Sequence, residues 1–425
     1  MEIQAASGFV LLIAAGIALF LANSPWSEQF NALWHTHLRV SLGDWAIDQS
    51  MLHWLNDGLM TIFFFVVGLE IKREIVEGEL REPRKAALPL MAAIGGMIAP
   101  AVIYLLMIGG EESGKTGWGI PMATDIAFVV GFLALLGNRV PLGLKILLLA
   151  LAIVDDIGAI LVIAVFYSTG VSGAAISLAV LGFALTLLAR WLGIRNVGIY
   201  VLISIGIWLA IFHSGIHPTV AGVLLGLLTP SKPILPRIAF RNALAAVLGR
   251  MGEDDEGTTH GRLSPARQIK GVAIESVSPL ERLETALHPW VAFVIMPLFA
   301  LGNAGVKIDL GVVTHPIAWS VAVGLVVGKP LGIVLFSWVA VQIGLAKLPT
   351  GVNWRAIAGA GFLAGIGFTM SLFIASLALD GDLLSAGKIG TLLGSAISAS
   401  IGLGLLRLVL PTGDRAQTDL APAEK

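Results

Sequence analysis

The chain has 425 residues, of which 56% are hydrophobic and only 13% are charged, and its net charge is −1. A soluble protein carries about 25% charged residues, so the composition excludes an ordinary water-exposed globule and indicates a protein embedded in lipid. There is no cysteine, which excludes disulfides and thiolate metal sites, and the near-neutral charge gives no indication of a nucleic-acid partner.

Twelve apolar segments follow one another along the chain. A helix needs roughly 20 apolar residues to cross the hydrocarbon core of a bilayer. We therefore expect an all-α polytopic membrane protein with about twelve transmembrane helices, in a single domain over residues 1–410. The segments are 8–22, 51–70, 86–108, 118–136, 144–167, 172–189, 197–212, 215–229, 285–304, 316–342, 354–379 and 386–406.

Three stretches fall outside these segments. Residues 24–50 form a loop in which two short apolar runs flank Gly43-Asp44, a pattern that fits either a β-hairpin or an ordinary loop. Residues 241–278 are polar and include an acidic run, which predicts a flexible cytoplasmic loop insertion. Residues 411–425 are predicted to be a disordered tail.

The distribution of basic residues predicts the orientation of the chain. Of the 27 Lys and Arg residues, 22 lie in loops on one side of the predicted membrane and 4 on the other. Basic loops stay in the cytoplasm, so both termini are expected to be cytoplasmic and the number of spans even. No Lys or Arg precedes Arg39, so the first segment lacks the basic region of a secretory signal.

Four charged residues lie in the middle of predicted spans: Asp125, Asp155, Asp156 and Lys329. Each costs about 2.5–3.5 kcal/mol at the centre of a membrane helix. Three acids and one base leave an excess of negative charge that a bound cation would balance. The structural alternatives are an ion pair between the adjacent aspartates and Lys329, and a helix cap at Asp125.

Two spans are predicted to be interrupted. Pro121 precedes Asp125 in the fourth span, and the eleventh contains four glycines between 359 and 367. Each is the middle span of a triplet, 86–167 or 316–406, and the triplets have opposite topology. We expect inverted-topology repeats whose interrupted helices cross near the midplane, a typical place for a transport site. The alternative is that the glycines only permit close packing.

Six segments of the sequence carry a family resemblance. They are Val67–Glu74, Ala123–Phe128, Ala152–Ala159, His288–Trp290, Gly328–Gly332 and Gly365–Ser371. In this order the set resembles the bacterial NhaA-type sodium/proton antiporters, and it extends over nearly the whole chain outside 241–278.

The resemblance implies roles for the charged residues in the spans. Asp155 and Asp156 would bind sodium and carry protons, with Thr124 as a further sodium ligand. Asp125, with Thr124, would lie at the helix crossing, and Lys329 would pair with Asp155. The resemblance also implies a pH-responsive group composed of Glu70, Arg73, Glu284, His288 and His217. The alternative for the two histidines is an ordinary place at a helix end.

The activity implied by the resemblance is exchange of Na⁺, and also of Li⁺, for H⁺ across the bacterial inner membrane. It would be electrogenic and pH-regulated, would serve sodium extrusion and pH homeostasis, and would need no cofactor. The resemblance also allows a homodimer formed through the outer loop 24–50.

Two other classes compete with this interpretation. A passive cation channel would also place acids at mid-depth. An intramembrane aspartyl protease, the enzyme alternative, usually has a Gly-x-Gly-Asp element, and neither Gly43-Asp44 nor Gly381-Asp382 lies in that pattern.

Overall fold

A computed structural model describes residues 2–43, 45–110, 112–168, 170–194, 196–233, 240–241, 273 and 275–410. Within these residues six helical segments are long and apolar enough to cross a membrane. They are α5 (Pro83–Ile108), α7 (Leu142–Phe166), α8 (Gly173–Trp191), α13 to α14 (Pro279–Asn303), α16 to α17 (Pro316–Gln342) and α20 (Gly381–Val409).

Three further pairs of helices are bent at a short break. They bring the number of spanning segments in the described part of the chain to nine if each pair is one span. The pairs are α1 (Glu2–Ala22) with α2 (Ser27–His35) at 114°, η3 (Glu112–Met122) with α6 (Ile126–Leu136) at 42°, and α18 (Trp354–Ala364) with α19 (Phe368–Ala378) at 48°. The prediction of an all-α membrane protein is therefore confirmed.

The remaining helices are short or divided, so the predicted number of twelve spans stays a prediction. Residues 51–76 form α3 (Met51–His53), η1 (Trp54–Leu59) and α4 (Met60–Val76), and α9 (Val197–Phe212) and α10 (Thr219–Leu228) are short apolar helices. The other short segments are η2 (Glu79–Arg81), η4 (Gly137–Arg139) and α15 (Leu310–Val313). Two of the six spanning segments are themselves divided: one into α13 (Pro279–Trp290), η5 (Val291–Ile295) and α14 (Met296–Asn303), and the other into α16 (Pro316–Val323), η6 (Gly324–Gly328) and α17 (Lys329–Gln342).

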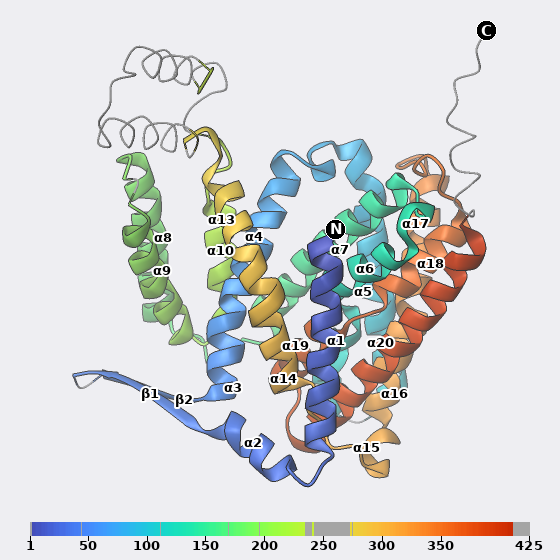
Figure 1. The fold of residues 1–425 in the computed structure, drawn as a ribbon, viewed down its shortest axis with the longest axis horizontal. Helices are drawn as coiled ribbons and strands as arrows, with labels where there is room; N and C mark the ends of the chain where they lie inside the picture. The colour runs from blue at the N-terminus through green and yellow to red at the C-terminus, as the bar shows by residue number, and fades with distance from the viewer. Residues whose placement is uncertain are drawn as a thin grey trace, which may run out of the picture.

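The loop after α2 is a β-hairpin, which decides between the two predictions for residues 24–50. Strand β1 (His37–Leu42) pairs antiparallel with β2 (Trp45–Ser50), with Val40 opposite Ile47. Gly43 in the turn has φ +61°, a conformation that glycine adopts without strain. The hairpin and α2 lie at the opposite end of α1 from the N-terminus (Figure 1).

Two predicted segments fall outside the described part of the chain. These are the insertion 241–278, apart from 241, 273 and 275–278, and the tail 411–425.

Helices α5 and α17 approach each other closely. A Cβ atom on Gly95 would lie 2.2 Å from the carbonyl oxygen of Gly332, so only glycine allows this spacing. Small residues are the usual means of close helix packing in membranes. The contact matters for the site because α17 begins at Lys329, directly after the π-helical segment η6.

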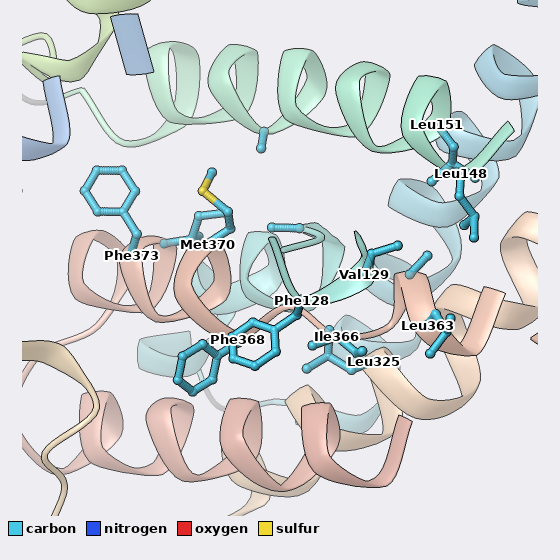
Figure 2. Close-up of a cluster of buried hydrophobic side chains, with 14 of the residues drawn as sticks. Phe128, Val129, Leu148, Leu151, Leu325, Leu363, Ile366, Phe368, Met370 and Phe373 are labelled. Carbon is cyan, nitrogen blue, oxygen red and sulfur yellow. The ribbon is translucent and has the colours of Figure 1, made fainter. Parts of the chain in front are cut away.

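Apolar side chains fill the space around the bent pairs η3–α6 and α18–α19. Phe128 of α6 and Phe368 of α19 meet edge to face, with ring centroids 4.8 Å apart, and Leu325 and Ile366 lie beside them (Figure 2). By contrast, α8 and α9 pack on each other at the edge of the molecule (Figure 1). The polar residues described next are therefore enclosed by the central helices.

Candidate ion-binding site

The breaks in two of the three bent pairs, η3–α6 and α18–α19, touch each other. Residues 123–125 separate η3 from α6, and residues 365–367 separate α18 from α19. The backbone N–H of Asp125 donates to the carbonyl of Ile366 at 2.8 Å, and the Thr124 hydroxyl lies 2.9 Å from the carbonyl of Ala364. The first break thus supplies N–H and O–H donors, and the second supplies carbonyl acceptors. Each needs the other, because no water reaches the hydrocarbon core to satisfy these groups.

Asp125 caps the N-termini of two helices. Its Oδ1 accepts the N–H of Phe128 in α6 at 3.3 Å, and its Oδ2 accepts the N–H of Thr369 in α19 at 3.1 Å. The Thr369 hydroxyl donates to the same oxygen. A carboxylate at a helix N-terminus satisfies free amides and opposes the positive end of the helix dipole. One buried carboxylate does this for both broken helices.

The opposite helix ends present carbonyl groups, and Lys329 meets one of them. Its ammonium donates to the carbonyl of Met122 and to Asp155 Oδ2, and the lysine is fully buried. The Ser371 hydroxyl donates to the carbonyl of Ile120 at 2.7 Å. The C-terminal end of η3 is therefore held by a cation and a hydroxyl.

The adjacent aspartates of α7 have different surroundings, as expected for successive residues on a helix, which point about 100° apart. Asp155 Oδ2 meets Lys329 and lies 2.5 Å from the Thr124 hydroxyl. Asp156 instead faces a cavity. Among the described residues, Oδ1 of each aspartate is buried without a hydrogen-bond partner. Such atoms are costly unless a proton or a cation compensates them.

The cavity has a volume of about 90 Å³ and lies between α1, α4, α6, α7, α19 and the middle of the α13–α14 segment. Its polar lining combines carboxylates with hydroxyl groups, and hard cations prefer such oxygen ligands. The polar residues in its wall are Ser7, Glu70, Thr124, Asp125, Asp156, His288 and Thr369.

Comparison with known proteins identifies the family. The sequence model of the family described as "Na+/H+ antiporter 1" matches residues 1–406. The chain belongs to this family.

Several relatives of this antiporter-family chain are about half identical to it. The "Na(+)/H(+) antiporter NhaA" of Rhodopirellula baltica is 49% identical over 415 residues, covering 98% of this chain and 94% of the relative. The protein of the same name from Rhizobium meliloti is 50% identical over 413 residues, with 96% and 93% covered. "Na(+)/H(+) antiporter NhaA 2" of Sorangium cellulosum is 48% identical over 424 residues, with 98% and 90% covered. These are transporters and not enzymes, so a protease is not favoured.

The residues expected to respond to pH lie in three places in this antiporter-family chain. Glu70 and His288 line the cavity, and Arg73 of α4 forms an ion pair with Glu284 of α13. His217 is not among the cavity residues. Its Nε2 lies 3.3 Å from Asp57 Oδ1, and its ring packs edge to face on Phe373.

Thr369 is a residue of the site that was not predicted from the sequence. It bonds to Asp125 through both its amide and its hydroxyl. The available signal was a hydroxyl residue two positions after Gly367, the last glycine of this run in the eleventh span.

Proposed function

We propose that this chain exchanges Na⁺ for H⁺ across the bacterial inner membrane, and that Li⁺ also serves as a substrate. The observation that carries the proposal is the pair of buried carboxylates beside two broken helices, one held by Lys329 and the other facing the cavity. The names of the relatives support the same ions.

Exchange follows from competition for the same oxygens. A proton on Asp156 neutralises the carboxylate, and a sodium ion does so by coordination, so binding of one releases the other. Asp125 and Thr124 supply further oxygens in the same cavity wall. Two interacting acids titrate as a pair, so the protons belong to Asp155 and Asp156 together.

Thr124 connects Asp155 to the cavity wall that Asp156 also lines. Thr124 has one hydroxyl hydrogen and faces two acceptors, Asp155 and the carbonyl of Ala364. When Asp155 is protonated, its O–H can donate a hydrogen bond to the Thr124 oxygen. The threonine hydrogen is then free for the carbonyl of Ala364, and the neutral Asp155 no longer forms an ion pair with Lys329. Thr124 thereby communicates the charge of Asp155 to the end of α18.

The architecture proposed with this function has twelve spans, cytoplasmic termini and inverted repeats over 86–167 and 316–406. Each of these triplets has a bent pair in its middle, at 42° and 48°, which supports the repeat. Within the transporter domain 1–410, Glu70, Arg73, Glu284, His288 and His217 are proposed to set the pH response. A homodimer through the outer loop is proposed because the hairpin exposes Leu38 and Val40.

The test is proton movement in vesicles that contain the purified protein. Pulses of Na⁺ and Li⁺, but not K⁺, should move protons across a series of pH values. Asp156→Asn should reduce this movement to that of protein-free vesicles, because the variant cannot exchange a proton for a cation. Asp382→Asn is the matched control, since this aspartate is exposed in the first turn of α20.

A different result would support the channel. If Na⁺ crosses equally well after the proton gradient has been collapsed and without counter-movement of protons, the protein is a passive conductor. Normal exchange by Asp156→Asn would show that the Asp156 carboxylate does not take part in the mechanism.

A further inference from the structure

We propose that Ser395 of α20 is a positioning residue for the cation site, because its hydroxyl holds the N-terminus of α19 in the orientation that Asp125 requires. The inference rests on the proposed exchange function and assigns a role to a helix that contributes no charged group to the site.

The contact joins α20 to the first residue of α19. Ser395 is buried, and its Oγ accepts the backbone N–H of Phe368 at 3.1 Å. The first amides of a helix have no acceptor within the helix, so each needs a partner from elsewhere. The next amide, that of Thr369, donates to Asp125 at 3.1 Å. Consecutive peptide groups are thus fixed by Ser395 and by the site carboxylate.

Packing also fixes Phe368, the residue that Ser395 contacts. The Phe368 ring packs against Phe128 with 4.8 Å between the centroids, in the apolar cluster of Figure 2. Without the hydroxyl, the Phe368 amide is a buried donor that has lost its acceptor. The start of α19 can then relax, and the two bonds from Thr369 to Asp125 relax with it.

A second hydroxyl of α20 supports this assignment. Ser398, one turn further along, donates to the carbonyl of Leu325 at 3.4 Å. Leu325 belongs to η6, the π-helical segment before Lys329. The same hydroxyl lies beside Gly365, where a Cβ atom would come within 2.8 Å of it. Helix α20 therefore contacts both the break in the α18–α19 pair and the segment that leads to Lys329.

The same helix offers a matched control. Thr391 is also fully buried, and its hydroxyl donates to the carbonyl of Gly387 within α20 at 2.9 Å. Thr391→Val removes a buried hydroxyl of similar size from the same helix without touching the α19 contact.

The experiment measures Na⁺-driven proton exchange in vesicles as a function of Na⁺ concentration. Ser395→Ala should raise the apparent KM for Na⁺ by roughly three- to tenfold, the effect of losing one net hydrogen bond. The maximum rate at saturating Na⁺ should stay within about twofold, because the charged groups are intact. Ser395→Thr, which keeps the hydroxyl, and Thr391→Val should both resemble the wild type.

An unchanged KM in Ser395→Ala, or an equal rise in Thr391→Val, would overturn the inference. Ser395→Cys keeps a weaker acceptor and should give an intermediate KM, so a wild-type value there also contradicts the role, even if the alanine variant does not fold. Absence of exchange in the wild type would instead refute the proposed function, which the same assay reports separately.

Discussion

At the scale of single residues, the four buried charges compensate one another and the helix ends around them. Lys329 contacts both Asp155 and the carbonyl of Met122, while Asp125 accepts amides from α6 and α19. Asp156 has no basic partner among the described residues and is the one aspartate of α7 that faces the cavity. Because of this difference, we assign the exchange of ions to Asp156.

Removing Lys329 should destabilise the fold. In Lys329→Ala, Asp155 remains buried without its ion-pair partner, and loss of one partner of a buried pair costs about 3–5 kcal/mol. The melting temperature in detergent should therefore fall. The double variant Lys329→Ala with Asp155→Ala should recover much of the loss, because no uncompensated charge remains. Equal melting temperatures for the wild type and the single variant would exclude a stabilising ion pair.

The charged residues and Thr124 were predicted from the sequence, but the hydroxyl contacts of Thr369 and Ser395 were not. A charge at the middle of an apolar span is rare and is therefore easy to recognise. Threonine and serine within helices commonly bond to their own backbone, as Thr391 does, so Thr369 and Ser395 carry no distinct signal in the sequence. Their roles depend on which helix lies opposite, which only the folded chain determines.

At the scale of helices, the site depends on how closely α5 and α17 pack. The contact between Gly95 and Gly332 brings α17 against α5 and so places Lys329 beside η3 and α7. A wider spacing would move the lysine away from both of its acceptors.

Gly95→Ala should disturb this spacing. The added Cβ would overlap the carbonyl of Gly332, and overpacking costs typically about 1–3 kcal/mol. We expect a lower melting temperature together with weaker exchange. Gly404→Ala, in α20, is the control, since no atom lies within 4 Å of the new Cβ and alanine favours helix. If both variants melt like the wild type, the close contact is not required.

The helix breaks were predictable, and the π-helical segments were not. Pro121 and the glycines up to Gly367 disfavour a continuous helix, and the interruptions occur next to these residues. The segments η5 and η6 have ordinary apolar sequences, so their wider turns follow from packing rather than from local preference. The sequence predicted either a hairpin or an ordinary loop for residues 24–50, because Gly43-Asp44 between short apolar runs is also common in loops.

At the scale of the whole molecule, the proposed orientation rests on the excess of basic residues in one set of loops. The α16–α17 segment offers a direct check, because exposed lysines flank it: Lys307 before it and Lys347 after it. The sequence has no cysteine, so an introduced thiol is the only one present.

A membrane-impermeant maleimide should label Lys307→Cys in right-side-out vesicles and Lys347→Cys only in inside-out vesicles. The reason is that the proposed topology places residue 307 outside and residue 347 in the cytoplasm. Both variants should retain exchange, which confirms that they are folded. The opposite labelling pattern would reverse the proposed orientation.

The central claim is that sodium and protons compete for the same buried carboxylates. The most direct test is calorimetry of Na⁺ binding to the purified protein in two buffers with different enthalpies of protonation. We predict that the binding heat depends on the buffer, because Na⁺ displaces protons, and that Asp156→Asn gives no such heat. Sodium binding with the same heat in both buffers, and therefore without proton release, would contradict the account.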